Sequence, residues 1–270
     1  MNSIATEVEN PKVVSEADWL TARKKLLAKE KEFTRLRDEL SRQRRELPWE
    51  KIRTNYVFDG SSGKEPLASL FDGRHQLIVY HFMLGPGWPQ GCPSCSYIAD
   101  HFDGLTIHLA NRDTTLVVVS HAPIAEIEAF KKRMGWKFKW VSSFGNDFNY
   151  DYHVSFTKEE IGTGSVYYNY SHGKFPGEEA PGASVFFKED DGNIFHTYST
   201  YGRGLDILLG AYNFLDLTPK GRDEADMHPH AMAWVRHHDR YSQTYFADQK
   251  DQLASIKTLS GACCSGDNHS

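Results

Sequence analysis

The segment HFMLGPGWPQGCPSCSYIADHF constrains the fold of this chain more than any other. An apolar run ends at its start, a loop rich in glycine and proline follows, and a helical pattern then begins at Pro93. Proline is favoured at the first position of a helix, where its missing N–H costs nothing. The segment therefore predicts a strand, a loop and a helix whose first turn carries Cys92 and Cys95.

A pair of cysteines at the start of a helix predicts redox chemistry. The unpaired amides and the positive dipole end of the helix point at the Cys92 sulfur and favour thiolate. Such sites lower a cysteine pKa by roughly one to several units from about 8.5. Cys95, one turn on, can close a disulfide with Cys92. We therefore expect Cys92 to attack and Cys95 to resolve, with Pro93 and Ser94 tuning the pair. The alternatives are buried structural cysteines or half of a zinc site.

The pattern around the dithiol is that of an α/β protein. The sequence predicts strands over 76–83, 114–120, 137–142, 164–171 and 184–197, the last interrupted by the turn 190–192, and helices over 93–110 and 123–134. Strand, helix, strand, helix and then a hairpin is the order of a thioredoxin-like fold. We expect a central mixed sheet flanked by helices.

A long helix is expected near the N-terminus. Ser15 followed by Asp18 resembles a capping box, and Pro48 stops the helix. Apolar residues recur every seven positions at Trp19, Leu26, Phe33, Leu40 and Leu47. The companion positions are half polar, so this seam favours docking on the chain's own domain, or a homodimer through the helix, over a free-standing coiled coil.

We divide the chain into three parts: an N-terminal helical extension (1–48), a thioredoxin-like domain (49–225), and a C-terminal extension with a flexible tail (226–270). The formal net charge of -5 gives no basic surplus, so neither a nucleic-acid nor a membrane partner is expected. The first residues do not resemble a secretory signal, which favours a cytoplasmic location. Four cysteines in 270 residues do not make a disulfide framework. No cofactor is indicated.

From about Trp19 to Tyr241 the sequence resembles the DUF899 family of thioredoxin-like proteins, which is related to the AhpC/TSA peroxiredoxins. The blocks GCPSCSYIADHFDG, RDTTLVVVSHAPIAEIEAFKKRMGWKFKWVSS, DFNYDYHV, HTYSTYGRGLDILLGAYNFLDLTPKGRDE and WVRHHDRY carry the resemblance. It implies a thioredoxin-like fold and thiol-disulfide oxidoreductase activity. The partners would be a small-molecule or protein thiol/disulfide substrate and a reductant of unknown identity.

Two departures from better-known relatives bear on the mechanism. Counting back from Cys92 places Pro89 where peroxiredoxins carry a hydroxyl, and Gly85 where they carry proline. The peroxide-orienting hydroxyl is therefore missing. Aligning on the turn at 190–192 places Ala183 where thioredoxins have a cis-proline, which widens the space opposite Cys92. That space favours a metal or a small ligand over a docked peptide.

Further candidate residues flank the dithiol in the sequence. His81 ends the strand before the loop and either acts with Cys92 and Cys95, as a base or metal ligand, or is a hydrogen-bonded strand residue. Trp88 either shields the sulfurs or packs. Tyr198 and Arg203 are candidate substrate-binding residues. A salt bridge from Arg203 to Asp206 or Glu224 is the structural alternative.

The C-terminal part contains His228, His230, His237, His238 and Asp239. Imidazoles are common metal ligands, but a polar, hydrogen-bonded surface extension explains the cluster better. We interpret Cys263 and Cys264 as accessory thiols. The function predicted first is a thiol-disulfide oxidoreductase. The alternatives are a thiol peroxidase, a metal-binding or metallochaperone module on Cys92, Cys95 and His81, and a small-molecule binding protein on the same fold.

Overall fold

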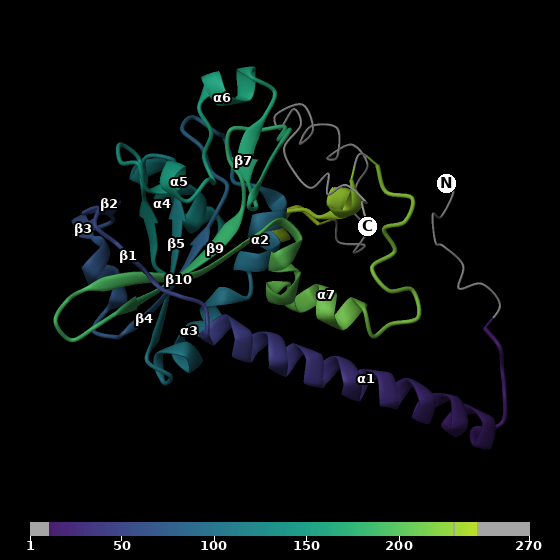
Figure 1. Cartoon of the computed structure of the whole chain (residues 1–270). Helices are drawn as coiled ribbons and strands as arrows, with labels where there is room; N and C mark the ends of the chain where they lie inside the picture. Colours follow the sequence, from purple (N-terminus) through teal and green to yellow (C-terminus); the bar gives the residue numbers. More distant parts are fainter. Residues whose placement is uncertain (1–10, 229, 242–270) are drawn as a thin grey trace.

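The computed structural model describes residues 11–228 and 230–241. A mixed sheet in the order β1-β10-β9-β4-β5-β6-β2-β3 forms the centre of the molecule (Figure 1). The strands are β1 (Glu50–Lys51), β2 (Val57–Gly60), β3 (Gly63–Pro66), β4 (Gln76–His81), β5 (Thr114–Ser120), β6 (Trp140–Ser142), β7 (Val166–Tyr168), β8 (Ser171–Gly173), β9 (Gly182–Lys188) and β10 (Ile194–Tyr201). The helices are α1 (Glu16–Arg45), α2 (Pro93–Ala99), α3 (Phe102–Ala110), α4 (Ile124–Met134), α5 (Phe148–Asp151), α6 (Lys158–Gly162) and α7 (Gly210–Leu215), with short 3-10 turns at Leu67–Phe71, Gly202–Leu208, Ala231–Trp234 and His238–Arg240.

The thioredoxin-like arrangement is confirmed. Strands β4 and β5 run parallel and are joined through α2 and α3, while β9 and β10 form an antiparallel hairpin on the other side of β4. All seven residues of β5 are buried, as expected for a central strand covered on both faces. Helix α4 ends at Gly135, whose φ of 69° is the left-handed cap that glycine adopts without strain.

The two faces of the sheet carry separate apolar cores. Alternation along β4 sends Tyr80 to the face covered by α2, α3 and α4, and Leu77 and Val79 to the face covered by the 3-10 turn and α5. The first core holds both cysteines of the dithiol, and we name it the dithiol face. The second is closed by Tyr152 and Tyr201, among other aromatic residues, and we name it the tyrosine face.

The helix expected over 93–110 is broken into α2 and α3. At the break the His101 amide bonds the Ile98 carbonyl, three residues back, and the His101 ring nitrogen Nδ1 lies 3.1 Å from the Tyr97 carbonyl oxygen. The side chain thus takes the carbonyl that the next α-helical bond would use. The prediction of one continuous helix was wrong for this local reason.

The strand expected over 164–171 is also different. A two-residue turn at Asn169 and Tyr170 divides it into the small hairpin β7–β8, which is a sheet of its own. Both turn residues have positive φ, 50° and 63°, the combination that a tight hairpin turn requires. The sequence offers asparagine and tyrosine where asparagine and glycine are the usual signal.

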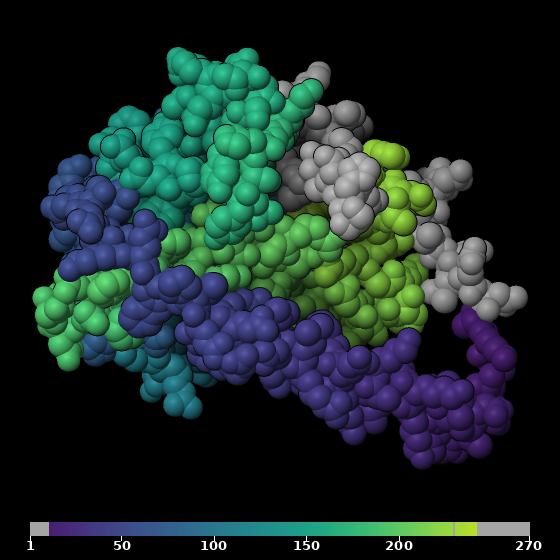
Figure 2. Space-filling model, viewed as in Figure 1, coloured from purple at the N-terminus to yellow at the C-terminus, as the bar shows by residue number. Residues whose placement is uncertain are grey.

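Helix α1 is present as expected, and the Ser15 hydroxyl accepts the Asp18 amide at its N-terminus. None of its residues is buried, and its heptad seam is 43 to 64% exposed at Trp19, Leu26, Phe33 and Leu40. Figures 1 and 2 show the helix extending beyond the body of the molecule. It therefore does not dock along its length on its own domain, and pairing with a second copy stays a prediction. Among the described residues, no helix is long and apolar enough to cross a membrane.

Candidate active site

Cys92 occupies the N-cap of α2, with Pro93 at the first helical position. The loop between β4 and α2 is fixed by the Cys92 amide, which donates to the Met83 carbonyl at 3.0 Å. Its own carbonyl accepts the Ser96 amide and the Ser96 hydroxyl. The residue before it is Gly91, where a Cβ would lie 2.5 Å from the Phe82 ring and force that ring to shift. The local sequence therefore places the first sulfur where it was predicted.

Cys95 faces the same core one turn later. Burial raises its pKa well above the ordinary value, and the hydrogen bond with Cys92 and the negative charge on Cys92 raise it further. The Tyr80 hydroxyl and the Met83 amide hydrogen-bond to the Cys95 sulfur and act in the opposite direction. Cys95 therefore keeps its proton when Cys92 is a thiolate, and it can share that proton with its neighbour.

Cys92 and Cys95 are both in the reduced form, and each residue is only 1% exposed. They lie in the core of the dithiol face, with Ala183 of β9 in the same cluster. Ala183 pairs with Tyr80 across the sheet, so β9 does face the dithiol at the position where a cis-proline was considered. In this conformation a substrate cannot reach either sulfur.

The C-terminal part of the described chain anchors against this region. We name residues 235–241 the C-terminal strap. The Asp239 carboxylate forms two 2.9 Å bonds with Arg133 of α4, and His238 bonds Asp100 at the end of α2. The His237 Nε2 nitrogen donates to the Gly91 carbonyl at 2.8 Å. One end of the strap is thus fixed to the residue next to Cys92.

Two histidines of the C-terminal part lie within electrostatic reach of Cys92. Burial lowers the pKa of His237 and of His230, and negative charge on Cys92 opposes that shift in both. Ionisation of the thiol and protonation of these imidazoles therefore favour each other. This corrects the expectation of a polar surface extension, because His237 and Arg236 are buried.

A second titratable pair lies on the loops at the same edge of the sheet. Glu179, which is buried before β9, accepts from the Ser155 hydroxyl at 2.6 Å and pairs with His121 at 3.0 Å. Burial raises the pKa of Glu179. Both Glu179 and Trp88 pack on Gly85, since a Cβ there would lie 3.3 Å and 3.0 Å from their atoms. This pair therefore adjoins the dithiol loop.

The structure brings some of the predicted site residues together. Trp88 is half-buried and packs against the core that holds the sulfurs, and Pro93 and Ser94 form the first turn between them. Their contacts are compatible with the tuning and shielding roles expected from the sequence, which stay predictions.

His81 is not part of this site. It follows Tyr80 on β4 and so faces the tyrosine face, where its ring stacks on Tyr152 at 5.8 Å and bonds the Ser184 hydroxyl at 2.8 Å. The set of Cys92, Cys95 and His81 therefore does not converge. Among the described residues, no group of three or more histidine, cysteine or acidic side chains could hold a metal ion.

Tyr198 and Arg203 also lie elsewhere. Tyr198 is covered by Arg44 of α1, whose guanidinium lies 5.5 Å from the ring. Arg203 is 81% exposed and pairs with Asp206, which is the structural alternative considered for it. The contacts of both side chains are therefore with other parts of the chain, and their expected roles in substrate binding stay predictions. Cys263 and Cys264 lie outside the described residues.

Comparison with known protein families identifies the family of this chain. The family described as a bacterial protein of unknown function, DUF899, matches residues 8–241. The chain belongs to the DUF899 family. No curated protein matches this DUF899 protein.

Three solved structures illustrate its similarities. Peroxidoxin BcpB from Mycobacterium tuberculosis is 12% identical with a TM-score of 0.40, covering 60% of this chain and 94% of its own. A cysteine mutant of peroxiredoxin Q from Xanthomonas campestris is 15% identical with a TM-score of 0.40, covering 62% and 98%. A PrxQ mutant from Xylella fastidiosa is 12% identical with a TM-score of 0.38, covering 62% and 94%.

Sequence reasoning did not place Tyr80 beside the dithiol, and it assigned His230 and His237 to a surface extension. For Tyr80 the signal existed, because period-two alternation along β4 puts it, and not His81, on the side of the dithiol. For His237 no local pattern in this DUF899 protein shows that a segment more than 140 residues later bonds Gly91.

Proposed function

We propose that this protein is a thiol-disulfide oxidoreductase. The Cys92 thiolate attacks one sulfur of a disulfide substrate, forms a mixed disulfide and releases the other sulfur as a thiolate. Cys95 then loses its proton and attacks the Cys92 sulfur. The second substrate thiol leaves, and a Cys92–Cys95 disulfide remains. An external dithiol reductant restores the pair and is itself oxidised to a disulfide.

The observation that carries the proposal is the asymmetry of the pair. Cys92 sits at the helix N-cap with imidazoles of the C-terminal part in electrostatic reach, whereas Cys95 holds its proton and hydrogen-bonds to Cys92. This asymmetry supports Cys92 as the attacking thiolate and Cys95 as the resolving thiol.

The burial of both sulfurs adds one requirement. A substrate reaches Cys92 only after part of the covering chain has moved. The C-terminal strap is the candidate, because its bonds to Arg133 and Asp100 are contacts between side chains that remain partly exposed. Such contacts are worth about 1 kcal/mol each. Opening the strap must also break the bond from His237 to the Gly91 carbonyl and expose Arg236 and His237, which are buried.

The experiment uses the full-length protein, with Cys92→Ser and Cys95→Ser variants and alkylation followed by mass spectrometry. With oxidised glutathione, the Cys95→Ser variant should accumulate a mixed disulfide on Cys92, and the Cys92→Ser variant should form none on Cys95. Reduction of the disulfide should fall by more than about a hundredfold in Cys92→Ser. Retention of full activity in that variant would refute the proposal.

Hydrogen peroxide serves as the comparison oxidant. Because Pro89 stands where peroxiredoxins have a hydroxyl, Cys92 should react with peroxide no faster than a free thiol of matched pKa. A much faster reaction, with sulfenic acid on Cys92, would indicate that the substrate is a peroxide and not a disulfide.

Metal analysis of protein purified without chelator tests the metallochaperone alternative, which predicts a stoichiometric metal that is lost in Cys95→Ser.

A further inference from the structure

Helix α1 carries an apolar seam that stays exposed in the single chain. Trp19, Leu26, Phe33 and Leu40 recur every seven residues along it and are 57, 53, 64 and 43% exposed. The helix extends beyond the body of the molecule, where the seam faces solvent (Figures 1 and 2). A spacing of seven residues keeps a seam on one side of a helix that coils around a partner helix. The seam therefore has the form of a contact surface for another helix.

The positions that flank the seam are all charged. With Trp19 at position a of the seven-residue repeat, the flanking positions are g, just before each a residue, and e, four residues after it. The g positions hold Asp18, Lys25, Glu32 and Glu39. The e positions hold Arg23, Glu30, Arg37 and Arg44. Four of these eight charges are negative and four are positive, so charge repulsion does not follow from net charge along the seam.

The order of these charges fits a second copy of the same helix. In a parallel pair of helices, each g residue lies opposite the e residue five positions further along the partner. Every such pair in this chain joins opposite charges: Asp18 with Arg23, Lys25 with Glu30, Glu32 with Arg37, and Glu39 with Arg44. Each pair occurs twice in a symmetric dimer. The charges along one helix are therefore complementary to those of a parallel copy.

An antiparallel pair of the same helices would lack this match. It places g opposite g and e opposite e. Depending on the register, this brings together like charges such as Arg23 with Arg44, or Glu32 with Glu39. Like charges in contact are destabilising. The charge order therefore selects the parallel direction.

Contacts within the single chain leave most of these charges available. Arg23 and Glu30 pair with each other at 2.8 Å, with side chains 38 and 45% exposed. Exposed ion pairs are weak, so their exchange for pairs across the seam costs little. Glu32 and Arg37 take part in none of the ion pairs of the described chain on this helix, which otherwise join Arg42 to its acidic neighbours.

The base of the helix is engaged with the body. The Arg44 guanidinium lies 5.5 Å from the centre of the Tyr198 ring of β10. The surface open to a partner is therefore the outer part, residues 18–40. Lys24 and Lys31 of this part occupy the outermost position of the repeat, so their charges point away from the seam.

We propose that α1 pairs with α1 of a second copy as a parallel two-stranded coiled coil over residues 18–40. Trp19, Leu26 and Phe33 are then buried between the helices, and the flanking charges fix the direction and favour a copy of the same chain as partner. Lys29, at an inner position of the repeat, lowers the stability of the seam and helps to fix its register. The two bodies lie at the same end of the joined arm. The dimer is independent of the redox proposal, which concerns residues of the body.

Sedimentation equilibrium on the full-length protein under reducing conditions measures the dimer. The parent protein should be a dimer at about 0.1 mM. Phe33→Gln removes one apolar residue of the seam from each helix and should weaken the dimer by more than about tenfold. Because Phe33 is 64% exposed in the single chain, the body should stay folded. Lys24→Gln, on the outward side of α1, is the matched control and should leave the dimer unchanged.

Charge reversal at Glu32 and Arg37 tests the direction. Glu32→Arg and Arg37→Glu each replace two attractions by two repulsions in the dimer, and each should weaken it by about tenfold. The double variant restores opposite charges and should dimerise like the parent. A mixture of the two single variants should form the mixed dimer in preference to either variant alone. Lys31→Glu makes the same change of charge as Arg37→Glu on the outward side and should have no effect.

The inference is overturned if the parent protein is a monomer at about 0.1 mM. It is also overturned by a dimer that neither Phe33→Gln nor Arg37→Glu weakens, because another surface would then form it. Failure of the double variant to recover would refute the parallel arrangement. Equal weakening by Lys31→Glu and Arg37→Glu would reduce the effect to one of net charge and would count against it as well.

Discussion

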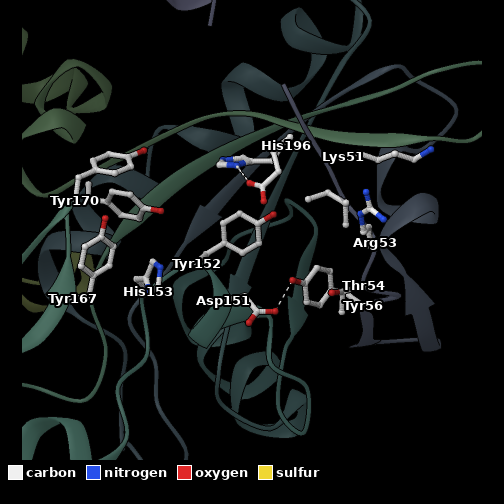
Figure 3. Close-up of a pocket in the computed structure, with 13 residues that line it drawn as sticks. Lys51, Arg53, Thr54, Tyr56, Asp151, Tyr152, His153, Tyr167, Tyr170 and His196 are labelled. Atoms are coloured by element: carbon white, nitrogen blue, oxygen red, sulfur yellow. Dashed lines mark hydrogen bonds and ion pairs between the residues drawn. The ribbon is translucent and has the colours of Figure 1, made fainter. Parts of the chain in front are cut away.

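The two faces of the central sheet differ in their exposure to solvent. On the dithiol face, the sulfurs lie in a dry core closed by aromatic side chains and adjoined by the C-terminal strap. On the tyrosine face, an open cleft of about 700 Å³ between β1 and the β7–β8 hairpin runs over a floor of hydroxyl and imidazole groups (Figure 3). The same strands supply both, because alternate residues of β4 point to opposite faces.

The difference shows where polar groups can be placed at low cost. Beneath the open cleft, His81 bonds Ser184, Ser184 bonds Ser199 at 2.8 Å, and Ser199 bonds His196 at 2.7 Å. This chain of hydrogen bonds ends at the cleft. In the dithiol face, Tyr80 and Met83 hydrogen-bond to Cys95 and both cysteines are almost fully buried, so access to the sulfurs depends on movement of the covering chain.

As the pH falls, protonation of His81 on the tyrosine face should lower the free energy of unfolding. Burial lowers the pKa of His81 to about 3, against about 6.5 in the unfolded chain. The unfolded state therefore takes up this proton first as pH falls. The stability that His81 contributes is complete above about pH 6.5 and is lost toward pH 3, by up to about 1.4 kcal/mol per pH unit. Urea unfolding at several pH values measures this slope.

His81→Gln should flatten the acid limb of that profile, and His172→Gln, an exposed change on β8, should leave it unaltered. His196, His230 and His237 are also shifted downward by burial and account for the slope that remains. An unchanged profile in His81→Gln would mean that His81 takes up a proton without unfolding, and that the tyrosine face is not the acid-sensitive one.

The packing of the dithiol face can be tested at Gly91. A Cβ at this position would lie 2.5 Å from Phe82 and 2.8 Å from Phe130, so both rings must shift. Gly91→Ala should therefore destabilise the protein by about 1–3 kcal/mol in urea unfolding. Gly104→Ala, in α3 with open space around it, is the matched control and should be neutral or stabilising. Equal stability of Gly91→Ala and the parent would show that the core next to Cys92 is loose.

The smallest expected effect concerns the C-terminal strap. Asp239→Asn removes the ion pair with Arg133, worth about 1 kcal/mol at a partly exposed site. The rate at which iodoacetamide alkylates Cys92 should rise by about fivefold, because the open form becomes more populated. Asp190→Asn, an exposed change in the β9–β10 turn, should leave the rate unaltered. A rate unchanged in Asp239→Asn would assign the opening to another segment.

The sequence predicted the elements whose signals are local. The apolar run of β5, the period of α4 and its glycine stop, and the proline after Cys92 each act within a few residues, and each prediction was confirmed. The break at His101 was missed because it depends on a side chain that competes with the backbone for a carbonyl.

The site was predictable only in part for a related reason. The spacing of Cys92 and Cys95 can be recognised in the sequence. Their neighbours come from β4, β9 and the C-terminal strap, which are brought together only by tertiary packing. The cleft on the other face has no motif at all. Its residues come from four separate stretches, and Tyr170 is a tyrosine where local preference alone would favour glycine.

Strand β1 joins two features that otherwise look unrelated. A short turn over residues 46–49 joins it to α1. In this turn Trp49 packs against Phe187 and Phe195, and Glu50 then pairs with His196 across the sheet edge. At 1.5 Å per residue, α1 is a lever of roughly 45 Å whose pivot is one wall of the cleft. Because β1 lines the cleft, a movement of this exposed helix about its base would displace one wall of the cleft.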